Sequence, residues 1–100
     1  MAEIAENAPG FKVLKISRAE IVEKLGPKGA IGVCDYCMKS PAIGYYVAVL
    51  DQWLCPECYQ DFITRNTPFP EDSHVESIMF NTYCRIFEVK INQLSPGAAK

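Results

Sequence analysis

The sequence predicts a single α+β domain organised around a metal site. It contains two Cys-x-x-Cys pairs, at 34–37 and 55–58, with 17 residues between them. Residues 45–50 combine aromatic and β-branched side chains and are therefore prone to form a strand. Residues 17–20 and 73–76 each match the capping box that begins a helix. A chain of 100 residues suits one hydrophobic core rather than two.

The domain is expected to span residues 11–94, with a flexible tail at each end. Residues 1–10 contain turn-forming residues and few large apolar side chains, and residues 95–100 have a similar composition. The metal module is expected to cover residues 33–66. About half of the side chains are apolar, which excludes a generally disordered chain.

The first section of the domain is predicted to be an extended segment followed by a short helix. Residues 11–16 are expected to be extended. Ser17 can accept the third helical N–H while Glu20 reaches back to the N–H of the cap residue. An apolar stripe then predicts a helix from 18 to 25, and the Gly-Pro dipeptide at 26–27 ends it.

The interval between the cysteine pairs predicts a β-hairpin. Residues 45–50 supply its first strand, residues 51–52 its turn, and Trp53 and Leu54 its return strand. Both faces of the first strand are apolar, so we expect flanking helices to cover one or both faces, or a partner to cover one. Pro56 suits the first turn of the helix that follows.

The last section predicts a helix over about 74–87. Its apolar residues recur at three- and four-residue steps, and Ser73 and Glu76 match a capping box. Glu76 and Asp72 are interpreted as helix-start residues rather than a catalytic carboxylate pair, because no basic or histidine partner accompanies them. Residues 87–92 alternate with period two, so the sequence leaves open whether they are helix or strand.

The two cysteine pairs predict a structural zinc site with four thiolate ligands. The ligands are Cys34, Cys37, Cys55 and Cys58. Zinc in structural sites takes four such ligands in a tetrahedron, with Zn–S near about 2.3 Å. Two cysteines separated by two residues can bind one ion from a single tight turn, and a hairpin of this length brings the second pair back to it. Backbone N–H groups at a helix start can also donate to the sulfurs.

Three other uses of the cysteines remain open. Iron in a rubredoxin-like site is held by similar pairs, but Met38 and Tyr59 stand where a glycine usually follows each rubredoxin pair. A thioredoxin-like dithiol at Cys55 and Cys58 leaves the first pair without a role. Plain disulfides are disfavoured because the N-terminus lacks the apolar core of a signal peptide and the number of cysteines, five, is odd.

Residues 34–66 resemble a treble-clef zinc finger, which consists of a knuckle, a hairpin and a Cys-x-x-Cys at the start of a helix. The cysteine spacing is similar to that of GATA-type fingers, and residues 53–59 resemble their step from strand to helix. The stretch also resembles small uncharacterised zinc-finger proteins of bacteria and their mobile elements. The resemblance covers about a third of the chain. It implies zinc and this fold but no particular function, because treble clefs serve nucleases, adaptors and ribosomal proteins.

The charge of the chain favours a protein partner over duplex DNA. The formal net charge is −2, and four thiolates around one Zn²⁺ bring the metal-loaded chain to about −4. GATA-type fingers bind DNA with a basic surface, and affinity for a duplex depends on neutralising its phosphates. Treble-clef nucleases place histidines beside a catalytic metal, whereas His74 is the single histidine here.

The remaining candidate functional residues are the fifth cysteine, the single histidine and a group of aromatic residues. Cys84 is expected to be a buried thiol on the apolar face of the last helix, and His74 an exposed first-turn residue. The aromatic side chains near the cysteine pairs are expected to pack the hairpin, with an exposed patch for a protein or single-stranded bases as the alternative. They are Tyr36, Tyr45, Tyr46, Trp53 and Tyr59.

We therefore expect a zinc-stabilised, non-catalytic module that binds a protein as an adaptor, regulator or inhibitor. The alternatives are a nucleic-acid-binding finger that uses the basic segment before the knuckle, and a thiol oxidoreductase that uses Cys55 and Cys58. The basic side chains of that segment are Lys12, Lys15, Arg18, Lys24 and Lys28. The longest nearly apolar run is eight residues, and the acidic N-terminus has no apolar core segment, so we expect a cytoplasmic protein with no membrane span.

Overall fold

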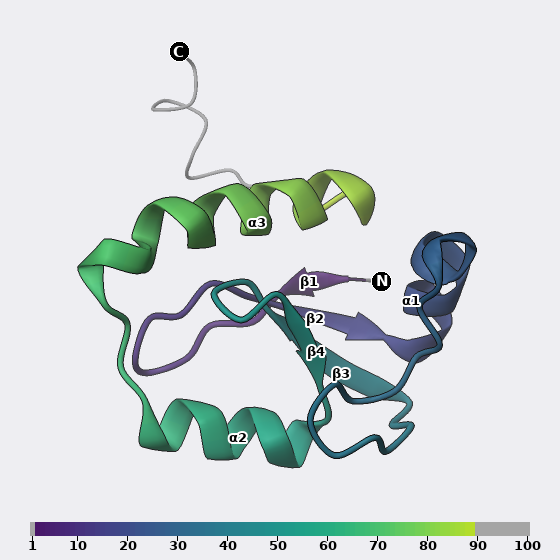
Figure 1. The fold of residues 1–100 in the computed structure, drawn as a ribbon, viewed down its shortest axis with the longest axis horizontal. Helices are drawn as coiled ribbons and strands as arrows, with labels where there is room; N and C mark the ends of the chain where they lie inside the picture. The colour runs from purple at the N-terminus through teal and green to yellow at the C-terminus, as the bar shows by residue number, and fades with distance from the viewer. Residues whose placement is uncertain (1, 90–100) are drawn as a thin grey trace.

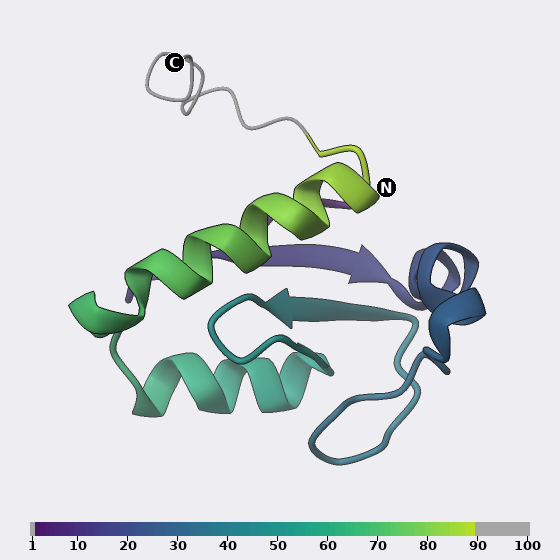
Figure 2. The same ribbon diagram turned by 45° about the horizontal axis from the view of Figure 1, so that its top comes forward.

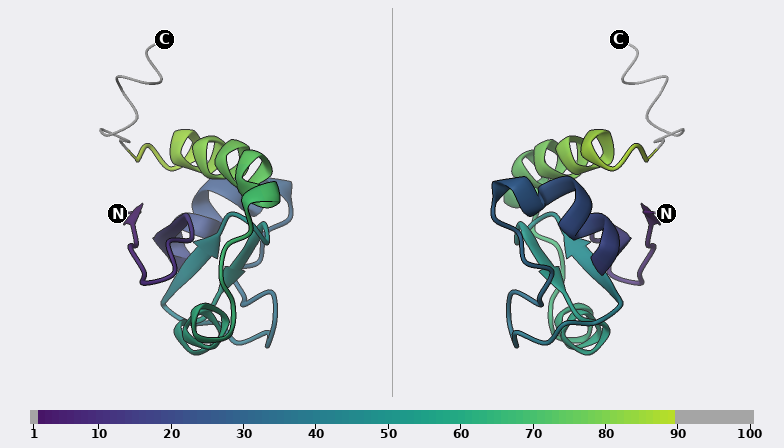
Figure 3. Two further views of the ribbon diagram at one scale, coloured as in Figure 1. Left: turned by 90° about the vertical axis from the view of Figure 1, so that its left-hand side faces the viewer. Right: turned by 90° about the vertical axis from the view of Figure 1, so that its right-hand side faces the viewer.

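Two helices enclose a central antiparallel sheet from opposite sides (Figures 1 and 3). The computed structural model describes residues 2–89. The strands are β1 (Glu3–Ile4), β2 (Val13–Ser17), β3 (Ile43–Val47) and β4 (Gln52–Leu54), and the helices are α1 (Arg18–Leu25), α2 (Pro56–Arg65) and α3 (Ser73–Ile86). Short 3₁₀ turns, Gly26–Lys28 and Pro70–Asp72, follow α1 and precede α3. The α+β class predicted from the sequence is confirmed.

The sheet has the strand order β1-β2-β3-β4, and all neighbouring strands are antiparallel. The β2–β3 pairing runs from Val13 opposite Val47 to Ser17 opposite Ile43. Between these two strands the chain passes through α1 and a long loop that carries the first cysteine pair (Figure 2). The predicted hairpin forms from β3 and β4, although its turn lies at 48–51 rather than 51–52.

One face of the sheet packs against α3 and α1. Leu14, Ile16 and Tyr46 of the strands contact Phe80 and Cys84 of α3 in this layer. The ring of Tyr46 also stacks on that of Tyr83, with centroids 3.7 Å apart and planes 10° from parallel. We call this cluster the α3-side core; it contains none of the four cysteines of the two pairs.

The opposite face of the sheet packs against α2. Val13, Val47 and Leu54 contact Tyr59 of this helix. The buried Cys34 and Cys55 belong to the same cluster, which we call the α2-side core. Ring contacts support the layer: Tyr45 stacks on Tyr59 at 4.2 Å, and Phe11 meets Phe62 at 4.7 Å. Both apolar faces of the hairpin are thus covered by helices of the chain itself, as the first alternative of the prediction required.

Helix α1 begins as its sequence predicts. The backbone N–H of Glu20 donates to Oγ of Ser17 at 3.2 Å, and the N–H of Ser17 donates to Oε1 of Glu20 at 3.3 Å. Both halves of the capping box are therefore present. The observed helix, Arg18–Leu25, has the predicted bounds.

Helix α3 has nearly the predicted extent but begins differently. Its N-cap is Asp72, and no side-chain hydrogen bond caps it. The carboxylate of Glu76 instead accepts the backbone N–H of Lys12 at 2.9 Å, and only 6% of Glu76 is exposed. The capping box predicted for 73–76 is therefore wrong, because a contact between residues 64 positions apart takes the glutamate.

The N-terminal segment differs from the predicted tail. Strand β1 pairs with Lys15 and Leu14 of β2, and the N–H of Ala5 donates to the carbonyl oxygen of Val13 at 2.9 Å. Two residues are too few for a period-two pattern, so this strand could not be predicted from the sequence. At the other end, Phe87 and Glu88 form a turn after α3, while residues 90–92 and the predicted tail at 95–100 lie outside the described residues.

Within residues 2–89, no helix has both the length and the apolar character needed to cross a membrane.

Gly44 lies against the indole of Trp53, and a side chain at this position has no room. A Cβ on Gly44 would lie 2.5 Å from Cε2 of Trp53 and 2.8 Å from the carbonyl oxygen of Leu54. We expect Gly44→Ala to lower the free energy of unfolding by about 2–3 kcal/mol, since overpacking a core typically costs about 1–3 kcal/mol. Urea denaturation followed by far-UV circular dichroism measures this change.

Gly26→Ala is the matched control. Its Cβ would meet Cγ1 of Val22 at an ordinary 3.7 Å, and its φ of −53° suits alanine. We expect stability to change by less than about 1 kcal/mol, because alanine restricts the unfolded chain but its Cβ also meets the ring of Pro27 in this helical conformation. Equal losses of stability in the two variants would show that Gly44 is not a packing constraint.

Candidate metal centre

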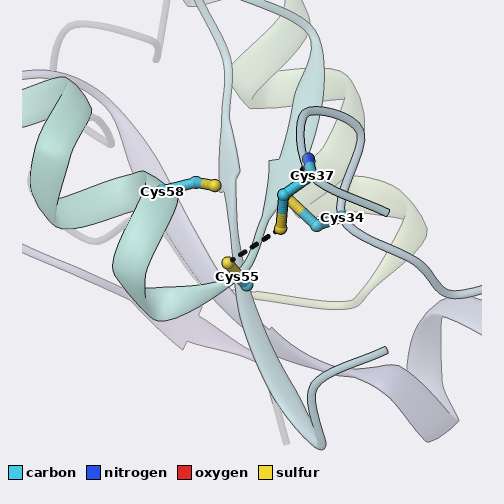
Figure 4. A group of neighbouring side chains, drawn as sticks. All are labelled: Cys34, Cys37, Cys55 and Cys58. Atoms are coloured by element: carbon cyan, nitrogen blue, oxygen red, sulfur yellow. Dashed lines mark hydrogen bonds between the residues drawn. The ribbon is translucent and has the colours of Figure 1, made fainter. Parts of the chain in front are cut away.

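The four cysteines of the two pairs converge on one point (Figure 4). The sulfur atoms of Cys34, Cys37, Cys55 and Cys58 all lie within 4.8 Å of one another, and those of Cys37 and Cys55 are 3.6 Å apart. A tetrahedral zinc ion with Zn–S of about 2.3 Å separates its sulfurs by about 3.8 Å. The observed spread therefore fits one metal ion after small side-chain adjustments.

The first pair lies on a tight knuckle in the loop before β3. The N–H of Cys34 donates to the carbonyl oxygen of Lys39 at 2.7 Å, and the N–H of Met38 donates to that of Cys34 at 3.0 Å. The N–H of Asp35 donates to the carbonyl oxygen of Trp53 at 2.9 Å. These bonds hold the knuckle beside the end of β4, where the second pair begins.

The second pair lies at the start of α2, as predicted. Cys55 is the N-cap residue, with φ −68° and ψ 162°, and Pro56 occupies the first helical turn. Cys58 follows almost one turn later, so both sulfurs project from the same end of the helix (Figure 4). The step from strand to helix therefore aims this pair at the knuckle.

Backbone N–H groups stabilise negative charge on the sulfur of Cys34. The N–H groups of Tyr36 and Cys37 both donate to this sulfur at 3.4 Å. Burial raises the pKa of Cys34, but hydrogen bonding to Cys37, Cys55 and Tyr36 outweighs burial and lowers the pKa to about 6. The donors predicted at the helix start are thus found chiefly on the knuckle.

Cys58 shows the opposite effect. Burial and contacts with the other three thiols raise its pKa well above the usual range. A proton on Cys58 relieves the crowding of negative charge that four thiolates would create. A bound dication supplies the same relief and lets all four sulfurs ionise, because metal ligation requires the thiolate.

The centre is buried on one side and open on the other. Cys34 and Cys55 are buried in the core under the sheet, whereas Cys37 is exposed and Cys58 is half-buried. A groove of about 620 Å³ runs beside the two accessible sulfurs, and Leu50, Leu54 and Phe62 contribute apolar side chains to it. An ion at this centre would therefore join the α2-side core to the protein surface.

Met38 adopts a left-handed backbone conformation. Its φ is 70°, in the region that favours glycine, and its side chain is exposed. It occupies the position where the sequence lacks the glycine that usually follows a rubredoxin pair. The backbone conformation of this turn favours glycine, so it does not account for the methionine at this position.

The burial of the other candidate residues mostly agrees with the sequence prediction. Cys84 is buried in the core between the sheet and α3, and His74 is exposed at the start of α3. Among the aromatic residues near the pairs, Tyr46, Trp53 and Tyr59 are buried, Tyr45 is half-buried, and Tyr36 is exposed. The packing interpretation of the aromatic group is confirmed for four residues and fails for Tyr36.

Sequence reasoning missed the role of Asp35. Its Oδ2 accepts the backbone N–H of Trp53 at 2.9 Å, in addition to the bond that its own N–H makes to the Trp53 carbonyl oxygen. An aspartate between two ligand cysteines has no distinctive spacing to its partner, so no sequence pattern could have indicated this pairing.

Comparison with known proteins gives no match to any family model, curated protein or solved structure.

We expect elemental analysis of the purified protein to find one zinc ion per chain. Cys55→Ser removes a buried ligand and should abolish stoichiometric zinc. Cys84→Ala removes a buried cysteine outside the cluster and should retain it, which makes it the matched control. Iron in place of zinc, or zinc retained in full by Cys55→Ser, would contradict the assignment.

Verified removal of the metal with a strong chelator should lower the melting temperature. Structural zinc contributes about 10–16 kcal/mol of apparent binding free energy in finger peptides, which is as large as the net stability of a typical domain. We expect loss of cooperative melting by circular dichroism. A melting curve that is unchanged after demonstrated metal loss would contradict a structural role.

The thiol of Cys84 should react slowly in the folded protein. Burial raises its pKa to about 11, against an ordinary value of 9.0, so at pH 8 less of it is thiolate than in the unfolded chain. We expect iodoacetamide to modify Cys84 of the zinc-loaded protein at least about tenfold more slowly than in urea, as measured by peptide mass spectrometry. The difference should narrow as the pH rises toward 11, and equal rates at pH 8 would contradict it.

Proposed function

We propose that this chain is a zinc-stabilised, non-catalytic module that binds another protein through the surface around its cysteine knuckle. The observation that carries this proposal is a set of exposed apolar side chains on and beside the knuckle. They are Ile31, Tyr36, Met38 and Leu50, with exposed fractions of 64%, 79%, 66% and 40%. We call these four residues the knuckle surface. Tyr36 and Leu50 border the groove beside the metal centre, whereas Ile31 and Met38 border a second cavity next to the knuckle. Exposed aromatic and methionine side chains of this kind are typical of protein-binding sites.

The ligand set supports a structural rather than a catalytic ion. A zinc ion held by four cysteines has no open position for water or substrate, whereas catalytic zinc sites keep one. The order of knuckle, β3–β4 hairpin and α2 also supports the treble-clef interpretation. In this proposal the ion fixes the surface and does not take part in chemistry.

The charge of the chain supports a partner with basic and apolar side chains. The metal-loaded chain carries about −4, and the groove beside the knuckle includes Glu57 and Asp61 on its lining. Each of these carboxylates faces one cation of the chain, Lys39 at 3.3 Å and Arg65 at 2.8 Å. Such exposed pairs are weak and can be exchanged for a partner's cations at little cost.

The conformation of Met38 supports a binding role for its side chain. A left-handed conformation costs a non-glycine residue roughly 1 kcal/mol, and an exposed side chain recovers little of this through packing. Strained residues of this kind are concentrated at functional sites. A contact outside the chain would account for methionine at this position.

Met38→Gly separates stability from binding. We expect the free energy of unfolding to rise by about 1 kcal/mol in urea denaturation, because glycine adopts this conformation without strain. We expect the same variant to bind the partner more weakly. A loss of stability would contradict the strain argument, and unchanged binding would remove Met38 from the proposed interface.

The nucleic-acid alternative has weaker support. Four of the five basic side chains before the knuckle are engaged within the described chain. Lys12 lies over the ring of Phe80 at 5.6 Å, Lys15 lies 3.9 Å from Glu3, Arg18 bonds the carbonyl oxygens of residues 31 and 32, and Lys24 lies 3.5 Å from Glu88. These cations therefore do not form one free basic face.

The oxidoreductase alternative also has weaker support. An attacking cysteine must be accessible, whereas Cys55 is buried at the N-cap of α2. This alternative predicts insulin reduction that is lost in Cys58→Ser. Absence of activity in the metal-loaded protein would exclude it.

Affinity capture with a paired variant tests the proposed function. The metal-loaded protein is used as bait in a lysate of its native host, beside Tyr36→Ser/Leu50→Ser and the control Val75→Ser/Ile78→Ser on α3. All four substituted side chains are exposed apolar residues. We expect a protein that the wild type and the control retain and the knuckle variant loses.

Two outcomes would contradict this function. One is that no captured protein depends on the knuckle residues. The other is micromolar binding of oligonucleotides with a steep dependence on salt, which would favour the nucleic-acid alternative.

A further inference from the structure

A second cavity lies beside the knuckle, with a lining that shares no residue with that of the groove. Its volume is about 310 Å³, and it is open to solvent on one side and lined by α1, the loop after it, the knuckle and the α3-side core. Three aromatic residues, Tyr46, Trp53 and Tyr83, and two carboxylates, Asp35 and Asp51, contribute to its lining. The remaining lining residues are apolar or glycine, and none of them is a cysteine of the metal centre.

We propose that this cavity binds an organic cation, either a guanidinium or an alkylammonium group with a short apolar stem. Two carboxylates beside aromatic rings are the groups that recognise such cations, since the charge and the ring quadrupoles attract them together. No lysine, arginine or histidine belongs to the described lining. An anion or a neutral polar molecule would find no complementary charge in it.

The two carboxylates are held in place and each keeps a free oxygen. Oδ2 of Asp35 accepts the backbone N–H of Trp53 at 2.9 Å, and Oδ1 of Asp51 accepts the hydroxyl of Tyr46 at 2.8 Å. Within residues 2–89 neither carboxylate forms an ion pair. Each can therefore accept a further hydrogen bond from a ligand without losing its present one.

Tyr83 lines the cavity together with both carboxylates. This side chain comes from α3, stacks on Tyr46, and lines the cavity. Its pKa is raised by burial and then by the negative charges of Asp51 and Asp35. Asp35 of the knuckle and Asp51 of the β3–β4 turn line the same cavity as this ring, so a cation inside it would be attracted by both carboxylates.

Arg18 bonds two residues that line the cavity. Its Nε donates to the carbonyl oxygen of Gly32 at 2.9 Å, and its Nη2 donates to that of Ile31 at 3.3 Å. Those bonds tie it to the backbone of the loop, and its side chain does not line the cavity. Its guanidinium therefore orders the wall and leaves the carboxylates available.

The volume limits the size of the ligand. A cavity of about 310 Å³ lies at the lower end of the range for small-molecule sites. It suits the end of one arginine or lysine side chain, or a small free amine, better than a nucleotide or an extended peptide. The inference is argued from the lining of the cavity and not from the proposed function, although Ile31 and Met38 belong both to that lining and to the knuckle surface.

The test is a titration of the metal-loaded protein with defined probes, followed by NMR. The probes are N-acetyl-arginine methylamide, its uncharged isostere N-acetyl-citrulline methylamide, and the free cations butylguanidinium and butylammonium. We expect the arginine probe to shift the ring resonances of Tyr83 and the amide of Asp51, with a Kd in the millimolar range or below. The citrulline probe should bind at least about tenfold more weakly.

Asp51→Asn tests whether a carboxylate of the cavity contributes to binding of the cation. Asn tolerates the left-handed φ of 55° at this position and keeps an oxygen for the Tyr46 hydroxyl, so the fold should persist. We expect about a tenfold loss of affinity for the cationic probes. Glu71→Gln, which removes an exposed carboxylate outside the cavity, is the matched control and should bind as the wild type does.

Each outcome decides the proposal. Equal affinity for the arginine and citrulline probes, equal affinity in Asp51→Asn and wild type, or no shift at these resonances up to about 10 mM probe would overturn it. Stronger binding of the blocked arginine than of the free cations would identify a protein side chain as the source. Stronger binding of the free cations would identify a small amine or guanidine.

Discussion

The reciprocal pairing of Asp35 with Trp53 is the contact on which the rest of the structure depends. Asp35 donates its backbone N–H to Trp53 and accepts the N–H of Trp53 on its carboxylate, both at 2.9 Å. The indole of the same tryptophan crosses to the other core and donates to the carbonyl oxygen of Ile16 at 3.0 Å. Trp53 thus holds the knuckle beside β4 and links β4 to β2 across the sheet.

The sheet separates two cores that differ in the kinds of side chain they contain. The α3-side core consists mainly of aliphatic and aromatic side chains, with Cys84 among them, and burial of these side chains needs no metal. The α2-side core includes Cys34 and Cys55, so its edge depends on sulfur atoms that repel one another when ionised. A metal ion converts that repulsion into four bonds. Because β2 and β3 contribute to both cores, we expect loss of a bound ion to affect α3 through the sheet.

Local signals in the sequence predicted local structure well, and long-range contacts account for the rest. The bounds of α1 follow from Ser17 and Glu20, whose bonds span three residues. The same pattern at 73–76 failed because Glu76 finds the backbone of Lys12 instead. The convergence of the four sulfurs followed from spacing alone, since the hairpin between the pairs fixes the distance. The cavity beside Asp35 could not be foreseen, because its walls come from segments with no shared period.

The knuckle joins the metal centre to both surfaces that we propose for binding. Its sulfurs point inward to the cluster, while Tyr36 borders the groove and Met38 borders the cavity with Asp35. Residues 34–38, which form the knuckle, cannot form a core of their own, so their conformation depends on the pairing with β4 and would depend on a bound ion. The strain at Met38 is compatible with this, since a turn held at both cysteines can keep a left-handed residue that a free loop would relax. Zinc in this protein would therefore act on recognition by restricting the knuckle to one conformation, which reduces the entropy that a partner must overcome on binding.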